Sequence, residues 1–141
     1  MTELMSLIYA SKVTPGFQDS LEINRILKTA RKNNEAKQIT GLLLCNLHYF
    51  LQVLEGPKSE LTNLYQTIAQ DSRHQDVTKI SESKVASRQF SDWQMGFYLF
   101  SPQEQETLPR DWTQLDFAQV QTIFTHVLHS HQGANNSFYS L

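Results

Sequence analysis

The spacing of apolar residues changes along the chain in an order that predicts alternating strands and helices. Residues 4–11 are typical of a first strand, which the breaker pair Pro15-Gly16 closes. Asp19 or Ser20 can then cap a helix in which apolar residues recur at helical spacing. The polar pair Asn33-Asn34 is expected to end this helix, because asparagine is favoured at helix C-termini.

Two further strands are predicted at residues 39–46 and 49–55. The connection between them is only Leu47-His48, so we expect an antiparallel hairpin. Gly56-Pro57 ends the second of these strands. A second amphipathic helix follows, with apolar positions at i, i+3, i+4 and i+7: Leu61, Leu64, Tyr65 and Ile68.

Weaker strand patterns at residues 77–85 and 95–100 complete a βαββαββ order. This order predicts an α+β fold, the ferredoxin-like sandwich with an added strand and with both helices on one face of the sheet. No internal repeat or linker divides the chain, so residues 1–100 are expected to form one domain.

Beyond residue 100 the sequence becomes more polar, and a helical extension is predicted over residues 101–131. It contains a short helix near residues 103–107 and an amphipathic helix with apolar positions Phe117, Val120, Ile123, Phe124, Val127 and Leu128. The amphipathic helix either contacts another protein or covers the second face of the sheet, which otherwise meets water. Residues 132–141 are rich in Asn, Ser and Gly and are expected to form a flexible tail.

Gln52 is the most informative residue of the chain, because it interrupts the apolar strand Phe50-Leu51-Gln52-Val53-Leu54. A buried amide without hydrogen-bond partners costs about 1 to 3 kcal/mol, so Gln52 calls for a partner. Strand residues alternate between the two faces of a sheet, which places Gln52 on the face of Phe50 and Leu54. If Tyr9 points toward the same helices, its hydroxyl lies in the same layer as the Gln52 amide.

Both predicted helices can add side chains to that layer. The first supplies Ile26, Ala30 and either Asn33 or Asn34 along one stripe, and the second supplies Ile68, with Asp71 one turn further on. A slot with apolar walls and polar groups at its rim suits a flat heteroaromatic ring.

Composition argues against several other classes of protein. The formal charge of −2 and the lack of a Lys/Arg stripe beyond Arg31-Lys32 argue against a nucleic-acid binder. The longest apolar run is too short to cross a membrane. The single Cys45 cannot form an internal disulfide, which favours a reducing cytoplasm and a role as a small core residue.

Three histidines near the C-terminus raise the question of a metal site. Helical spacing places His126 and His129 on one face, and His131 follows. No carboxylate or cysteine joins them at the spacing of known metal sites, so no metal is predicted.

Six segments resemble, in order and spacing, the BLUF family of blue-light sensors using FAD. They are Leu7-Ile8-Tyr9-Ala10-Ser11, Arg31-Lys32-Asn33-Asn34, Ile39-Thr40-Gly41-Leu42-Leu43, Phe50-Leu51-Gln52-Val53-Leu54-Glu55-Gly56, Asp71-Ser72-Arg73-His74 and Phe90-Ser91-Asp92-Trp93-Gln94-Met95. The resemblance covers residues 4–100 and implies a βαββαββ domain that holds an oxidised flavin between its two helices.

The resemblance also implies roles for individual residues. Tyr9 matches the tyrosine that donates an electron to the excited flavin, and Gln52 matches the glutamine between that tyrosine and the flavin edge. The implied flavin contacts are Asn34 with Asn33 beside it, the sandwiching pair Ile26 and Ile68, and the bordering set Asp71, Arg73 and His74. Trp93 and Met95 match the pair that relays the light signal outward.

Three positions depart from the family pattern. Gln94 stands between Trp93 and Met95 where relatives often have serine, Ala30 lacks a hydroxyl that some relatives carry beside the flavin, and Thr67 replaces a basic residue. Threonine at position 67 lacks the positive charge of that basic residue, so weaker binding of the flavin phosphates is expected. None of the three removes the pair Tyr9 and Gln52.

The expected function is a blue-light photoreceptor that is not an enzyme. Its cofactor would be FAD, with FMN or riboflavin as alternatives, and its output would pass to an unidentified downstream protein or to a second copy of the chain. One alternative is a light-independent flavin-binding redox or regulatory module. A small hydrolase of the acylphosphatase type would need a basic, Gly-rich phosphate loop, which the Pro15-Gly16 turn lacks.

Overall fold

The core of the molecule is a mixed sheet of five strands, described here from a computed structural model that covers residues 3–18, 20–91 and 95–133. The strands and helices of the first part are β1 (Leu4–Val13), α1 (Ser20–Lys37), β2 (Thr40–Cys45), β3 (Tyr49–Pro57), α2 (Lys58–Ala69), β4 (His74–Lys84) and β5 (Gly96–Leu99). A short α3 (Pro102–Gln105), a 3₁₀ turn η1 (Trp112–Gln114) and a long α4 (Phe117–Gly133) follow.

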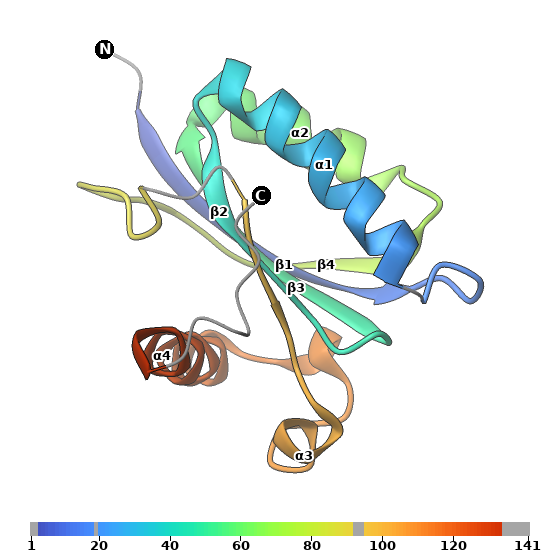
Figure 1. Cartoon of the computed structure of the whole chain (residues 1–141). Coiled ribbons are helices and arrows are strands. Elements are labelled where there is room, and N and C mark those ends of the chain that lie inside the picture. The colour runs from blue at the N-terminus through green and yellow to red at the C-terminus, as the bar shows by residue number, and fades with distance from the viewer. Residues whose placement is uncertain (1–2, 19, 92–94, 134–141) are drawn as a thin grey trace.

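The strand order is β4-β1-β3-β2-β5. β1 is antiparallel to both β3 and β4, β2 and β3 form the predicted hairpin, and β5 adds to the edge of the sheet in parallel with β2. This topology confirms the ferredoxin-like α+β fold with an added strand. α1 and α2 lie side by side over one face of the sheet, and α4 lies under the other (Figure 1).

The two faces of the sheet bury two separate cores, as the alternation of side chains along the strands predicts. On the face of α1 and α2, Leu7 and Leu54 pack with Leu27. On the opposite face, Leu51 and Val53 pack against the C-terminal residues Trp112, Val120, Ile123, Phe124 and Val127. The amphipathic C-terminal helix therefore covers the second face, which was one of the two alternatives left open by the sequence.

The predicted end of the first helix is wrong. α1 continues through Asn33-Asn34 to Lys37, and Gln38, with φ of 58°, adopts the left-handed conformation that follows many helices. Asn34 is buried, with 1% of its surface exposed, so tertiary contacts outweigh the modest helix propensity of asparagine.

Smaller corrections concern the ends of other elements. β1 extends to Val13 and β4 begins at His74, because the two strands pair with each other beyond the apolar residues that marked them in the sequence. The short helix is α3, whose N-terminus is fixed by a capping box between Ser101 and Glu104. The predicted boundary between the extension and the tail is wrong at residues 132 and 133, which belong to α4, and the rest of the predicted tail, residues 134–141, lies outside the described residues. None of the described helices is both long and apolar enough to span a lipid bilayer.

Candidate functional site

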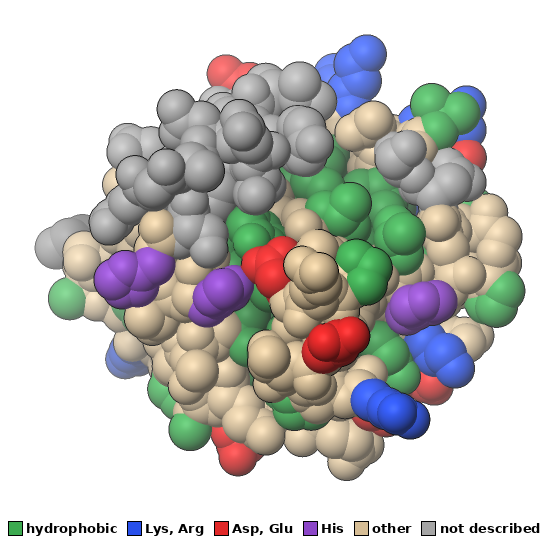
Figure 2. All heavy atoms as spheres, turned by 60° about the horizontal axis from the view of Figure 1, so that its bottom comes forward, with side chains coloured by type: hydrophobic (Ala, Val, Ile, Leu, Met, Phe, Trp, Pro, Cys, Tyr) green, Lys and Arg blue, Asp and Glu red, His purple; other side chains and the backbone are tan. Residues whose placement is uncertain are grey.

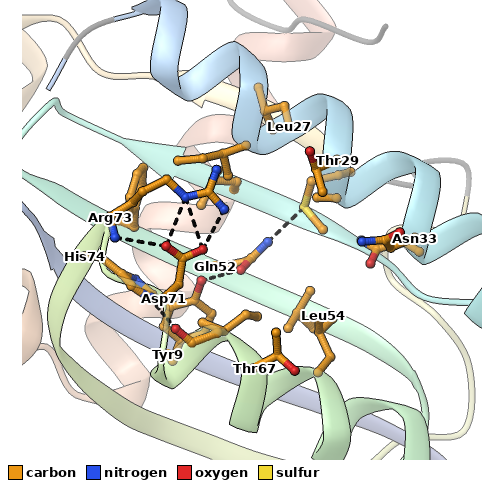
Figure 3. Close-up of a pocket in the computed structure, with 18 residues that line it drawn as sticks. Tyr9, Leu27, Thr29, Asn33, Gln52, Leu54, Thr67, Asp71, Arg73 and His74 are labelled. Atoms are coloured by element: carbon orange, nitrogen blue, oxygen red, sulfur yellow. Dashed lines mark hydrogen bonds and ion pairs between the residues drawn. The ribbon is translucent and has the colours of Figure 1, made fainter. Parts of the chain in front are cut away.

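A cleft lies between α1 and α2 above the central strands, and it encloses about 820 Å³ when its open mouth is included. Its walls are mostly apolar and come from α1, α2 and the strands beneath, whereas polar side chains gather at its floor and at one end (Figure 3). Among the apolar lining residues are Ile26, Leu27, Leu43, Leu54, Leu64 and Ile68.

Tyr9 and Gln52 form the floor of the cleft. They are directly opposite each other in the pairing of β1 with β3, and the Tyr9 hydroxyl donates a hydrogen bond to Gln52 Oε1 at 2.5 Å. Tyr9 is 3% exposed and Gln52 is 6% exposed. Burial strongly raises the pKa of Tyr9, so the phenol is neutral and acts as the hydrogen-bond donor.

The other end of the Gln52 amide contacts Met95. Nε2 lies 3.2 Å from Met95 Sδ, so the amide bridges a phenol on one side and a thioether on the other. Sulfur is a weak acceptor, and this second contact is therefore the weaker of the two. The backbone of Met95 is held separately, because Arg31 of α1 donates from Nε to the Met95 carbonyl oxygen at 2.9 Å.

Asp71 and Arg73 close one end of the cleft. The Asp71 carboxylate accepts hydrogen bonds from the backbone N–H and the guanidinium of Arg73, the shortest being Nη2 to Oδ2 at 2.6 Å. These bonds hold the pKa of Asp71 below its usual range and raise the pKa of Arg73. The pair is fixed in a geometry that turns a charged edge toward the cleft (Figure 3).

His74 joins three elements beside this pair. Its Nε2 donates to the carbonyl oxygen of Ile68, at the end of α2, at 2.5 Å, since a carbonyl can only accept. Its Nδ1 lies 2.7 Å from the hydroxyl of Ser11 on β1. The ring also meets Tyr9 and Phe50 edge-on, with centroids 6.1 and 6.2 Å apart. His74 therefore positions the floor of the cleft as well as lining it.

The structure brings together most of the residues singled out in the sequence. Tyr9, Ile26, Ala30, Asn33, Asn34, Gln52, Thr67, Ile68, Asp71, Arg73, His74 and Met95 all line the one cleft. Trp93 and Gln94 lie outside the described residues. Thr29 and Leu64 also line the cleft and were missed. Helical spacing could have found Thr29, which follows Ile26 by three positions and precedes Asn33 by four.

His126 has a partner that its own helix could not reveal. Its Nε2 lies 2.9 Å from Glu104 Oε2 at the end of α3, on the side of the sheet away from the cleft. Figure 2 shows histidine side chains exposed on this side of the molecule, near carboxylates. Within the described part of the chain, no group of three or more His, Cys, Asp or Glu residues is placed to hold a metal ion.

The residues of the cleft fit a flavin ring. Two isoleucines on facing helices, Ile26 and Ile68, can lie above and below a planar ring, and the buried amides of Asn34 and Gln52 can bond to its polar edges. A planar amide carries both donors and an acceptor, which matches a ring edge that presents nitrogen and carbonyl oxygen atoms.

Comparisons with known proteins point in the same direction. The model of the BLUF family, described as sensors of blue-light using FAD, matches residues 4–96. The photoactivated adenylate cyclase subunit beta of Euglena gracilis is 40% identical over 93 residues, which are 65% of this chain and 11% of that protein. The blue light- and temperature-regulated antirepressor BluF of Escherichia coli (strain K12) is 31% identical over 87 residues, 62% of this chain and 21% of that protein. This chain thus spans only about a tenth to a fifth of the length of these two relatives.

Solved structures resemble nearly the whole chain. The dark-state structure of BlrB, a BLUF protein, superposes with a TM-score of 0.75 at 33% identity and covers 92% of this chain and 98% of that one. The ground-state structure of BlsA gives a TM-score of 0.78 at 23% identity, covers 89% of this chain and 87% of that one, and supports the fold.

Proposed function

This chain belongs to the BLUF family of blue-light sensors using FAD, and from that premise we propose how its own residues hold the flavin and convert light into a structural change. The chain of contacts from Tyr9 through Gln52 to Met95, at the floor of the cleft, is the observation that carries the proposal. It gives the cleft one group that can lose an electron and a proton and a neighbouring amide that can turn.

Ile26 and Ile68 are proposed to sandwich the isoalloxazine ring. Asn34, with Asn33 beside it, bonds to the pyrimidine side of the ring, an assignment supported by the place of both residues on the α1 wall of the cleft. Asp71, Arg73 and His74 border the ring or its ribityl chain. Thr29 and Thr67 add hydroxyls to the two walls, although the Thr67 hydroxyl already donates to the carbonyl of Asn63.

A bound flavin, once excited by blue light, would supply the one-electron oxidant that accepts an electron. Tyr9 is proposed to give up an electron and its hydroxyl proton, and the neutral, buried phenol is in the protonation state that this step needs. Gln52 accepts the hydrogen bond from that hydroxyl and is the residue through which the proton moves. Rotation or tautomerisation of the amide reverses the polarity that it presents to its neighbours. After rotation, Met95 Sδ faces the amide oxygen, so the Nε2 contact is lost, and the Tyr9 oxygen faces a donor in place of Oε1.

Met95 and Trp93 are proposed to relay this change outward. The family description names FAD, and we propose FAD as the cofactor; FMN and riboflavin share the ring that the cleft residues would contact. We infer that residues 1–100 are the sensor and that the chain has no enzymatic activity of its own. The name of the Euglena gracilis relative includes a cyclase activity, but the match to this chain covers only 11% of that protein.

The C-terminal layer on the second sheet face is the proposed contact surface for a downstream protein or a second copy of the chain. We propose a cytoplasmic setting because Cys45 is buried and is a free thiol rather than part of a disulfide. Thermal return to the starting state would make the response reversible.

An absorption spectrum before and after blue illumination tests the proposal. Purified chain should carry FAD, and its flavin band should shift slightly to the red and recover in the dark. Tyr9→Phe and Gln52→Leu should still bind flavin and should lose the shift. A Gln52→Leu variant that keeps the shift would refute the mechanism. Flavin binding with no shift in the unaltered chain would favour the light-independent module.

A further inference from the structure

Tyr9 lies against a second tyrosine, which is outside the set of residues that lines the cleft. This is Tyr65 of α2, whose ring centroid is 5.9 Å from that of Tyr9, with an angle of 61° between the ring planes. Burial raises the pKa of Tyr65, so its phenol is protonated. Tyr65 is only partly buried, whereas Tyr9 is 3% exposed. The two rings therefore form an aromatic path from the floor of the cleft toward the protein surface.

A cation lies over the ring of Tyr65. It is the ammonium group of Lys79, whose Nζ is 5.0 Å from the ring centroid. Lys79 of β4 pairs with Tyr9 of β1, as Gln52 of β3 does on the other side of that strand. Paired residues of neighbouring strands share a face of the sheet, so Lys79 starts from the face that carries Tyr9. Its Nζ also donates to Glu82 Oε2 at 2.8 Å, which gives the ammonium group a second contact.

This cation changes how easily Tyr65 loses an electron. The face of an aromatic ring attracts a cation, and a ring that has lost an electron loses that attraction. At exposed sites the attraction corresponds to a factor of about two to five in an equilibrium constant. Oxidation of the Tyr65 ring is therefore disfavoured by about that factor while the Lys79 ammonium group stays over it.

We propose that Tyr65 is a second redox-active tyrosine, which can return an electron to oxidised Tyr9, and that Lys79 restrains this transfer by lying over the Tyr65 ring. The inference rests on the proposed function, in which Tyr9 loses an electron and its hydroxyl proton. In the further step an electron passes from the Tyr65 ring to the Tyr9 radical, and the O–H bond of Tyr65 breaks. The Tyr65 proton goes to solvent, and the Tyr9 oxygen takes back the proton that left through Gln52.

The transfer draws the unpaired electron away from the Gln52 amide. Tyr9 is hydrogen-bonded to Gln52, so a radical at Tyr9 acts directly on the group that is proposed to turn. A radical on Tyr65 has given its proton to solvent and lies one ring further from that amide. Lys79 therefore favours the rearrangement at Gln52 over loss of the radical toward the surface.

Electron paramagnetic resonance of the full chain, loaded with FAD and frozen under blue light, tests the transfer. The tyrosyl signal that depends on Tyr65 is the difference between each protein and the same protein carrying Tyr65→Phe. In Lys79→Met this signal should be about two- to fivefold larger than in the unaltered chain. Lys79→Arg keeps the cation and should give the signal of the unaltered chain. Lys84→Met is the matched control, because it removes another lysine of β4 that pairs with a glutamate, Glu3, at 2.6 Å.

Three results would count against the inference. An equal Tyr65-dependent signal in Lys79→Met and in the unaltered chain overturns the role of Lys79, as does an equal increase in Lys84→Met. The absence of this signal from every protein overturns the role of Tyr65. A light-driven red shift in the unaltered chain, found together with any of these results, leaves the proposed function standing.

The NMR spectrum of the same chain in the dark gives a readout that does not depend on the photocycle. The ring current of Tyr65 should move the Cε protons of Lys79 upfield of those of Lys84, and Tyr65→Leu should remove the difference. Equal positions in the unaltered chain would overturn the contact between Lys79 and the ring. If the unaltered chain shows no light-driven shift, the proposed function fails, and these protons still decide whether Lys79 lies over Tyr65.

Discussion

The hydrogen bond between Tyr9 and Gln52 can be measured as a coupling energy in the flavin-free chain. Tyr9→Phe removes the hydroxyl that donates to Gln52 Oε1 at 2.5 Å and leaves that oxygen unpaired. Gln52→Leu leaves the Tyr9 hydroxyl unpaired and also removes the contact with Met95. Both residues are more than nine-tenths buried, so each single variant should lose about 1 to 3 kcal/mol of stability through an unsatisfied polar group.

The double variant Tyr9→Phe/Gln52→Leu leaves neither group unpaired. Its loss of stability should therefore be smaller than the sum of the two single losses, by about 1 to 3 kcal/mol. Urea unfolding of the four proteins in the dark measures this difference. Tyr65→Phe serves as the control tyrosine: its ring lies 5.9 Å from that of Tyr9, and its effect should add to that of Gln52→Leu within about 0.5 kcal/mol. Additive losses for Tyr9→Phe and Gln52→Leu would show that the two side chains do not bond in solution.

Three further predictions concern stability. Gly41→Ala should cost about 1 to 3 kcal/mol in urea unfolding, because a Cβ there would stand 2.1 Å from a backbone carbonyl oxygen of β3. Phe124→Ala should cost about 3 to 5 kcal/mol, since Phe124 is 1% exposed, whereas Phe117→Ala, 51% exposed, should change the free energy of unfolding by less than about 0.5 kcal/mol. The Asp71 carboxyl has a pKa below its unfolded value of 3.8, so its pairing with Arg73 stabilises the fold fully above that pH and is lost as the pH falls through the lowered pKa. As the pH is lowered from about 5, the free energy of unfolding should therefore fall less in Asp71→Asn than in the unaltered chain. Urea unfolding at a series of acid pH values measures this, and equal decreases in the two proteins would contradict it.

Local patterns were enough to predict the order of elements because each strand and helix buries one side. Period-two spacing placed Gln52 on the face of Phe50 and Leu54, and Tyr9 joined it on the condition that its strand turned the same face to the helices. Helical spacing placed Ile26 and Ile68 on the apolar stripes of their helices, and the family resemblance implied that they face each other across a flavin. The end of α1 was mispredicted because a local preference of asparagine was outweighed by burial of Asn34, which depends on residues far away in the sequence. Propensity is a weak guide wherever tertiary contacts decide.

The contacts that orient the site could not be predicted from the sequence, because they too join residues that are far apart in the chain. Ser11 and His74 are 63 positions apart, and Arg31 and Met95 are 64 apart. No spacing rule links such residues. The register of β1 against β3, which sets Tyr9 directly opposite Gln52, also follows from packing of the whole sheet. The resemblance to the BLUF family indicated, by the order of its motifs, which residues act together, and the fold supplies the distances between them.

The cleft and the C-terminal layer lie on opposite faces of the sheet, so a change at Gln52 could reach α4 only through the sheet or around its edge. Through the sheet, the link is the packing of Leu51 and Val53, on a strand paired on both sides. Around the edge, the link is β5, which in the described part of the chain pairs only with β2.

The edge route also has directional contacts. β5 follows Met95 directly, and the hydroxyl of its Tyr98 donates to the Glu104 carboxylate of α3. The same carboxylate oxygen lies 2.9 Å from Nε2 of His126 on α4. A strand paired on one side shifts at a lower cost in backbone hydrogen bonds than a strand paired on two. Because its motion would also carry Tyr98 and Glu104 with it, β5 is the element through which a displacement of Met95 is expected to reach the C-terminal layer.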